Sequence, residues 1–241
     1  MRLGVFSDTH GNSVALQAVL ADAAERGLER FIFLGDAVVN GPDPQAVFDT
    51  LAKLEMQAWV QGNTDGLFDH VTPDWEPTTP EEERALEYFT FAKDRLSPEA
   101  VNHLGQLPFS ASLELGSLSA LCVHGSPRSS SEGIGPAVAT EEILDMTFDV
   151  SEQIVLCGHT HAPYDGYVGD RRIINPGAVG YSYDGDPRAA YGILTLTKGG
   201  DVDFEHIRVP YDRDEAIARA RAEGLPFLDR YESLLLRGHR V

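Results

Sequence analysis

Cysteine and lysine are both scarce in this sequence. Its two cysteines, Cys122 and Cys157, are too far apart to form a Cys-x-x-Cys motif, and each lies in an apolar run typical of a buried strand. We therefore expect two buried free thiols, with a disulfide as the alternative. Only three residues are lysines, and none of them follows a glycine. Because a Walker P-loop needs a Gly-Lys pair, the sequence excludes ordinary P-loop NTPase chemistry.

Long apolar runs are also missing. The longest stretch without Asp, Glu, Lys or Arg spans residues 100–113, and it contains His103 and Pro108. This stretch is shorter than the ~18 apolar residues that a membrane-spanning helix requires. Asp8 interrupts the apolar run near the N-terminus, so we do not expect a signal peptide. These patterns predict a cytoplasmic protein that does not enter a membrane.

Positive charge is in short supply. The 38 acidic residues outnumber the 19 basic ones and give a formal net charge of −19. A surface of this sign repels the phosphate backbone, which argues against nonspecific binding of nucleic acid. Some of the surplus carboxylates could instead hold cations. A bound divalent ion reverses the local charge, so a phosphate substrate remains compatible with this composition.

Apolar runs and helical patterns alternate in the first part of the chain. One helix is expected from a cap at Asn12 or Ser13, and a second from a cap at Asp43 with Pro44 in its first turn, continuing to Leu54. Strand, helix and strand in this alternation indicate parallel strands with right-handed crossovers, and hence an α/β fold. The strands expected here are residues 3–6, 31–34 and 56–61.

Residues 66–108 differ in character from the segments on either side. Helix starts are expected at Thr79-Pro80 and at Ser97-Pro98, each with acidic residues in the first turn. We interpret this segment as a helical, cap-like insertion into a single domain over residues 1–241. It could cover a site, or it could be a purely structural helical pair on the rim.

The remainder of the chain is predicted to be rich in strands, with two helices at the end, around Ala216 and Leu228. The Lys198-Gly199-Gly200-Asp201 segment is typical of a hairpin turn between the last two strands. The strands expected here are residues 112–115, 119–123, 153–157, 164–168, 171–174, 191–197 and 202–209.

Five of the predicted strands end in a polar side chain beside a glycine. Ligands of open α/β sheets bind beyond the carboxyl ends of the strands, so these turns could converge on one place. Each turn alone is commonplace, but together their carboxylate, amide and imidazole groups suit two adjacent divalent ions. The residues at these strand ends are Asp8, His10, Asp36, Asn63, His124, His159 and His161.

The order of these motifs resembles the calcineurin-like metallophosphoesterase superfamily. Its pattern of D-x-H, G-D, G-N-H-D/E, a single His and G-H-x-H matches this sequence over residues 4–180, and residues 175–180 resemble an N-P-G-S-V-G segment of its small bacterial members. The resemblance implies a four-layer α/β/β/α sandwich of two mixed sheets. It also implies one metal held by Asp8, His10, Asp36 and His161, and a second held by Asp36, Asn63, His124 and His159.

Two such ions would make hydroxide available at neutral pH and polarise the phosphoryl oxygens, so no covalent phosphoenzyme is required. We place Asp36, Asn63 and Asp65 among the catalytic residues. The metals could be Mn, Fe, Zn, Ni or Co. Arg128 and Arg188 could clamp phosphate oxygens, or they could be surface arginines paired with carboxylates.

Thr64 departs from the family pattern, which usually has histidine at this position. A threonine hydroxyl does not titrate near pH 7, so it cannot protonate a leaving group. We therefore expect a small-molecule substrate with a good leaving group, such as a phosphodiester, a nucleotide or a dinucleoside polyphosphate. The alternatives are a phosphomonoesterase or protein phosphatase using the same site, and a non-catalytic metal-binding scaffold of the same fold.

Overall fold

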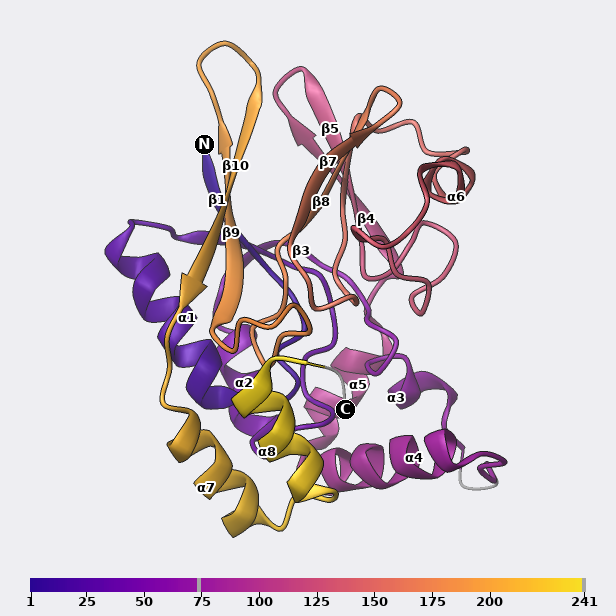
Figure 1. Cartoon of the computed structure of the whole chain (residues 1–241), viewed down its shortest axis with the longest axis vertical. Coiled ribbons are helices and arrows are strands. Elements are labelled where there is room, and N and C mark those ends of the chain that lie inside the picture. The colour runs from indigo at the N-terminus through magenta and orange to yellow at the C-terminus, as the bar shows by residue number, and fades with distance from the viewer. Residues whose placement is uncertain (73–74, 240–241) are drawn as a thin grey trace.

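Two five-stranded sheets pack face to face in the computed structural model, which describes residues 1–72 and 75–239 (Figure 1). The first sheet has the order β10-β9-β1-β2-β3. Strands β1, β2 and β3 are parallel to one another, β9 pairs antiparallel with β1, and β10 pairs antiparallel with β9. Its strands are β1 (Arg2–Phe6), β2 (Arg30–Phe33), β3 (Glu55–Trp59), β9 (Ala189–Leu196) and β10 (Val202–Val209).

The second sheet has the order β4-β5-β6-β8-β7. Its central strands β5, β6 and β8 run parallel, and the edge strands β4 and β7 pair antiparallel with their neighbours. Its strands are β4 (Ser110–Leu115), β5 (Leu118–Val123), β6 (Ile154–Leu156), β7 (Tyr164–Val168) and β8 (Arg171–Asn175). All ten predicted strands are therefore present.

Helices cover the outer faces of both sheets. Helix α1 (Ser13–Glu25) packs on the face of the first sheet, and α6 (Thr140–Met146) covers the second sheet on the other side of the molecule (Figure 1). Helices α2 (Pro44–Leu51) and α7 (Arg213–Glu223) pack against α1, α8 (Leu228–Arg237) packs against α7, and all of them contribute to the same core. Side chains of a strand alternate between its two faces. Phe31 and Phe33 accordingly pack under the helices, whereas Ile32 and Leu34 lie between the sheets. This is the predicted four-layer sandwich.

Local signals in the sequence located most helix starts. The Asn12 side chain caps α1 by accepting a hydrogen bond from the Ala15 amide, as expected. Asp43 precedes α2 but makes no capping bond, because its carboxylate accepts the Ser13 hydroxyl instead. The same helix ends at Leu51, three residues earlier than predicted, and α6 was not predicted at all.

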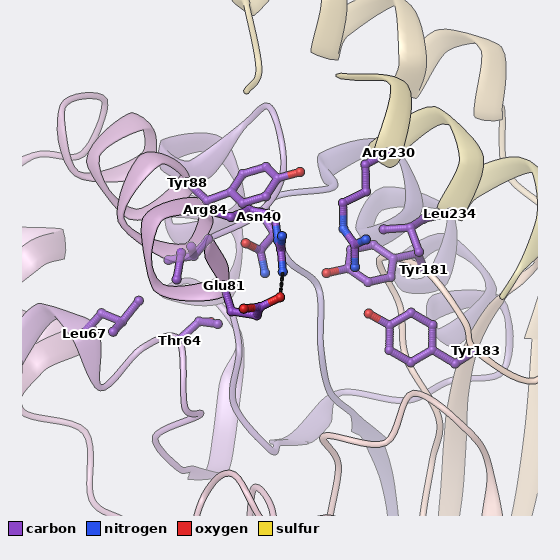
Figure 2. Close-up of a pocket in the computed structure, with 12 residues that line it drawn as sticks. Asn40, Thr64, Leu67, Glu81, Arg84, Tyr88, Tyr181, Tyr183, Arg230 and Leu234 are labelled. Carbon is purple, nitrogen blue, oxygen red and sulfur yellow. Dashed lines mark ion pairs between the residues drawn. The ribbon is translucent and has the colours of Figure 1, made fainter. Parts of the chain in front are cut away.

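The segment 66–108 forms three helices: α3 (Leu67–His70), α4 (Pro80–Lys93) and α5 (Pro98–Gly105). Both predicted helix starts are confirmed, and Thr79 forms a full capping box with Glu82. Helix α5 buries Ala100 and Leu104 in the main core, so it is structural. Helix α4 faces α8 across a cavity (Figure 2). The interpretation of the segment as a cap stays a prediction, and its residues 73 and 74 lie outside the described ranges.

Both cysteines are buried free thiols, as expected. Burial raises the pKa of each thiol to about 12, which keeps it protonated and unreactive at neutral pH. Among the described residues, none of the helices has the length and apolar character needed to cross a bilayer.

Candidate metal centre

The seven polar residues at the strand ends come together at one edge of the two sheets. Asp8 and His10 follow β1, Asp36 follows β2 and Asn63 follows β3, all from the first sheet. The second sheet contributes residues from the loops after β5 and β6: His124, His159 and His161. The convergence expected from parallel strands is thus observed, and it joins both sheets in one site.

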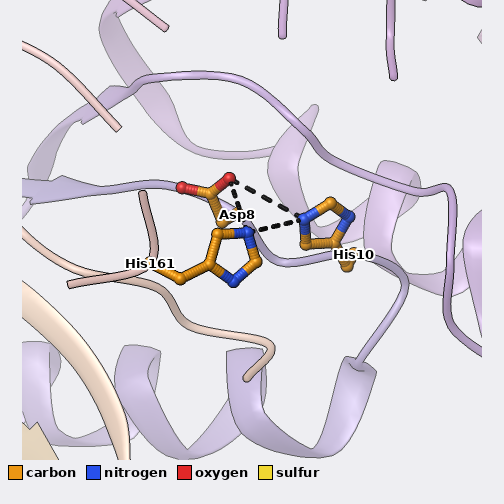
Figure 3. Close-up of side chains that lie close together, drawn as sticks. All are labelled: Asp8, His10 and His161. Carbon is orange, nitrogen blue, oxygen red and sulfur yellow. Dashed lines mark hydrogen bonds and ion pairs between the residues drawn. The ribbon is translucent and has the colours of Figure 1, made fainter. Parts of the chain in front are cut away.

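Asp8, His10 and His161 form the first of two overlapping groups (Figure 3). The Asp8 Oδ1 atom lies 3.2 Å from His161 Nε2 and 3.7 Å from His10 Nε2. The two imidazole nitrogens are themselves 3.1 Å apart. One carboxylate oxygen and two ring nitrogens therefore face a common point, and all three residues are buried.

The second group contains Asp36 and His124 and shares Asp8 with the first, and Asn63 and His159 lie beside it. Asn63 Oδ1 lies 3.1 Å from His124 Nε2 and 2.9 Å from His159 Nδ1. Asp36 Oδ2 lies 3.5 Å from His124 Nε2 and 3.6 Å from His10 Nε2 of the first group. Asp36 Oδ2 consequently lies between imidazoles of the two groups, and so does Asp8 Oδ1, which is 3.8 Å from His124 Nε2.

Backbone carbonyls orient three of the imidazoles. A carbonyl oxygen can only accept a hydrogen bond, so in each of these rings Nδ1 must carry the proton and Nε2 presents its lone pair to the centre when the ring is neutral. This arrangement is common for histidines that bind metals. The carbonyl partners of His10, His124 and His161 are those of Val39, Leu34 and Tyr181, at 2.9, 2.6 and 2.7 Å.

The donor set fits divalent cations on two further observations. The buried Asp8 Oδ1 atom has no hydrogen-bond partner among the described residues, and a buried carboxylate oxygen in this state is costly. The Nε2 atoms of His10 and His161 lie 3.1 Å apart, and when both rings are neutral with Nδ1 protonated, a cation bound by both would relieve the repulsion of their lone pairs. Imidazole, carboxylate and amide ligands suit transition metals such as Mn, Fe, Zn, Ni and Co.

The electrostatics of the site also favour cations. Burial raises the pKa of Asp8, but His161 and His124 outweigh it and hold this pKa at about 2. Burial opposes ionisation of Asp36 as well, yet His124 and His10 keep its pKa far below the ordinary value. Burial lowers the pKa of His124, but Asp36 and Asp8 raise it more, to about 10. Both carboxylates are therefore charged, and they stabilise positive charge beside them.

Backbone strain is concentrated at these residues. In the described ranges seven non-glycine residues have positive φ, and five of the seven are proposed metal ligands. A sixth, Asn40 at φ 83°, lines the cavity beside them. Left-handed backbone is unfavourable for residues with a Cβ atom, and such strain gathers at functional sites. The five ligands are Asp8, His10, Asp36, His159 and His161.

Two glycines allow the loops of the site to approach one another. A Cβ atom at Gly62 would lie 2.1 Å from Asp36 Oδ1, and one at Gly158 would lie 2.2 Å from Ser7 Oγ. Neither contact is possible, so any larger residue would push the ligand loops apart. These are the glycines of the G-N and G-H motifs in the sequence.

Asp65, expected among the catalytic residues, is not among the described residues that line the cavity at this centre. Its carboxylate is fully buried and accepts backbone N–H bonds from Asp36 at 2.7 Å, Gly62 at 2.9 Å and Ala37 at 3.0 Å. Burial and the nearby Asp36 raise the pKa of Asp65 to about 6. Both of its oxygens accept bonds from the loop that carries Asp36, and one also accepts from Gly62 after β3, so Asp65 connects these two loops.

The metal centre opens into a cavity of about 390 Å³. Thr64 lines it, with its amide donating to Asp36 Oδ1 at 2.9 Å and its buried hydroxyl lacking a partner among the described residues. Tyr181 stacks on His10 at 4.9 Å between ring centroids, and Tyr183 stacks on His161 at 4.5 Å. Sequence reasoning missed both tyrosines and Asn40, because single residues in loops carry no periodic signal.

The two arginines expected to bind phosphate do not line this cavity among the described residues. Arg128 pairs with Glu132 at 2.6 Å and with Asp145 at 2.5 Å, and it lines a different pocket. Arg188 pairs with its neighbour Asp186 at 2.5 Å on the surface. In a chain with 38 acidic residues, exposed guanidinium groups form ion pairs with carboxylates close in sequence. The alternative reading of these residues as surface ion pairs therefore agrees with the structure.

Several known proteins are similar to this chain over nearly its whole length. The chain is 30% identical to a metallophosphoesterase from Sphaerobacter thermophilus, whose crystal structure matches with a TM-score of 0.78 and 99% of each chain covered. A hypothetical protein from Pyrococcus horikoshii shares the fold, with a TM-score of 0.83 at 22% identity over 100% of this chain and 99% of that one. An uncharacterized protein of Methanocaldococcus jannaschii is 24% identical in an alignment of 249 positions that covers 93% of each sequence.

The family model of the calcineurin-like phosphoesterase superfamily domain matches residues 1–199, most of the chain. Its description and the strand-end ligands agree in pointing to hydrolysis of phosphate esters. The match indicates a hydrolase, and the protein belongs to the calcineurin-like phosphoesterase superfamily.

Proposed function

We propose that this protein is a dinuclear metal-dependent phosphoesterase that hydrolyses small phosphate esters or anhydrides with good leaving groups, and that it acts in the cytoplasm. The observation that carries the proposal is the position of Asp36, whose Oδ2 atom lies within 3.6 Å of imidazole nitrogens from both ligand groups. A carboxylate shared by two sets of ligands is what a site for two adjacent cations needs.

The residues would share the work as follows. Asp8, His10, Asp36 and His161 would hold one cation, and Asp36, Asn63, His124 and His159 the other. Two bound divalent cations would supply Lewis acidity for the phosphoryl group and would lower the pKa of water.

The residues around the two ligand groups orient the site and the substrate. Carbonyl partners fix the orientation of three imidazoles, and Asp65 fixes the Asp36 loop. The Thr64 hydroxyl can donate one hydrogen bond to a phosphoryl oxygen of the substrate, which would satisfy a group that is otherwise unpartnered among the described residues.

The nature of residue 64 favours substrates whose leaving group departs as a stable anion. Thr64 lines the cavity at the position where related sequences usually have histidine, and its hydroxyl cannot supply a proton near neutral pH. An alkoxide leaving group suffers most from this lack, whereas a nucleotide phosphate or a phenolate needs little help. Phosphodiesters, nucleotides and dinucleoside polyphosphates are therefore the proposed substrates.

The test begins with protein stripped by a chelator and reloaded with Mn, Fe, Zn, Ni or Co. Bis(p-nitrophenyl) phosphate hydrolysis should require the metal, and Asp36→Asn should lower kcat at least ~10³-fold, with Asp203→Asn on the exposed side of β10 as a control that leaves the rate unchanged. Metal content is measured on the same samples. Normal turnover by Asp36→Asn would show that the site is wrongly assigned.

Leaving-group dependence is tested by plotting the log of the rate against leaving-group pKa for wild type and Thr64→His. The wild type should show a steep dependence, and the histidine should accelerate only the poor leaving groups, by up to ~10²–10⁴-fold. Parallel lines would refute the substrate argument but not the metal centre. Metal binding without turnover of any ester would instead support the scaffold alternative.

A further inference from the structure

A second cavity of about 180 Å³ adjoins the metal centre. Helix α4 lines one wall with residues spaced by three and four positions, so that they share one helix face. Helix α8 lines the facing wall with residues four positions apart, and the loop after β8 contributes two tyrosines (Figure 2). The side chains concerned are Glu81, Arg84 and Tyr88 on α4, Arg230 and Leu234 on α8, and Tyr181 and Tyr183 in the loop.

The two cavities are adjacent and share part of their lining. Asn40, Thr64, Tyr181 and Tyr183 line both of them. The smaller cavity is below the ~300–1,000 Å³ that typically encloses a whole small-molecule ligand. It therefore suits one group of a ligand whose reacting part lies at the metal centre.

The charge of the smaller cavity is opposite to that of the molecule. Its lining contains two arginines and one glutamate, whereas the whole chain has a net charge of −19. Arg84 has a long ion pair with Glu81, at 3.9 Å, and Arg230 approaches from the other wall (Figure 2). Guanidinium groups bind phosphate through paired N–H donors, and tyrosine hydroxyls can add further hydrogen bonds.

We infer that this cavity is a subsite for a second phosphate group of the substrate. Arg84 and Arg230 bind this second phosphate while the scissile phosphate lies at the metal centre. The inference rests on the proposed phosphoesterase function and narrows its substrates to phosphoanhydrides, in which a second phosphate adjoins the first. An ester with a single phosphorus atom can react at the metal centre but leaves the subsite unused.

The test compares Arg84→Gln, Arg230→Gln and the control Arg237→Gln, an exposed arginine of α8 that is not part of the lining. For a dinucleoside tetraphosphate, kcat/KM should fall about 10- to 100-fold in the first two variants, the loss typical of a hydrogen bond to a charged group. For bis(p-nitrophenyl) phosphate, all three variants should stay within about threefold of wild type, which also shows that they are folded. Equal losses on both substrates, or no loss on either, would overturn the inference.

A binding measurement separates this inference from the function on which it rests. Calorimetric titration of manganese-loaded, dialysed protein uses methylenediphosphonate, which resists hydrolysis, and methylphosphonate, which has one phosphorus atom. The diphosphonate should bind at least about tenfold more weakly to Arg84→Gln and Arg230→Gln than to wild type, and methylphosphonate should not discriminate. If wild type hydrolyses neither ester but shows this pattern, the proposed function fails and the subsite stands. If it hydrolyses both and diphosphonate binding is unchanged in the variants, the subsite fails and the function stands.

Discussion

Five ligand residues have left-handed backbone, which lowers the stability of the fold, and all five lie at the metal centre. Each such residue costs roughly 1–3 kcal/mol in the absence of compensation. The strain is useful because it turns side chains from three different loops, those after β1, β2 and β6, toward one point, which regular strand or helix backbone would not do. The hydrogen bonds of the surrounding loops hold the strained conformations, and cation binding would repay part of their cost.

Asp65→Asn tests how strongly one residue holds this arrangement. The amide has a single acceptor oxygen, so its NH₂ group would face at least one of the three backbone N–H groups that the carboxylate now accepts. The free energy of unfolding should fall by about 1–3 kcal/mol, the usual cost of a buried unsatisfied donor. Urea denaturation measures it, and Asp69→Asn, on exposed α3, is the matched control. An unchanged midpoint in Asp65→Asn would mean that the Asp36 loop keeps its shape without this carboxylate.

Individual site residues were predictable from the sequence to the extent that they follow strands. The ligand candidates each end an apolar run beside a glycine, and parallel strands bring such ends together. Arg84 and Arg230 had no comparable signal, because their proximity depends on how α4 and α8 pack, over 140 positions apart in the chain. Arg128 and Arg188 suited the chemistry but had carboxylates nearby.

At the scale of elements, strong local patterns gave the secondary structure. Buried strands produce short apolar runs bounded by turns, and each of the ten runs predicted to be a strand is one. Helix α6 escaped notice because its seven residues span barely two turns and carry only two buried side chains, Ile143 and Met146. Asp43 illustrates the limit of capping rules, since a tertiary contact with Ser13 displaced the local hydrogen bond.

The capping box of α4 gives a prediction for this element. Thr79 accepts the Glu82 amide, and the Glu82 side chain bonds back to the Thr79 amide. Thr79→Ala removes half of this reciprocal pair and should lower the free energy of unfolding by about 1 kcal/mol. Thr90→Ala, on the exposed face of the same helix, should be neutral or slightly stabilising because alanine has the higher helix propensity. Equal effects of the two substitutions on the urea midpoint would show that the box contributes nothing.

At the scale of the whole molecule, negative charges repel one another in two separate places, on the surface and in the buried site. The net charge of −19 is spread over a surface that water and salt can screen, whereas Asp8 and Asp36 are buried at the metal centre and cannot be screened in this way. Salt therefore acts on the surface repulsion and a bound divalent cation on the buried one. Because the metal centre joins loops from both sheets, repulsion between its buried carboxylates affects the whole sandwich.

Removal of divalent metal should therefore destabilise the protein in a manner that simple salt does not reverse. A ligand at 100 times its Kd stabilises the folded state by about 2.7 kcal/mol, which for a chain of this length corresponds to a Tm shift of several degrees. Chelator-treated protein should recover this Tm with millimolar Mn²⁺, but 0.5 M NaCl, which screens only the exposed charges, should have a much smaller effect. The Asp36→Asn variant should lose most of the response to Mn²⁺ while keeping the response to NaCl. Equal recovery with either salt, in wild type and variant alike, would mean that Mn²⁺ acts on the acidic surface and not at the strand-end residues.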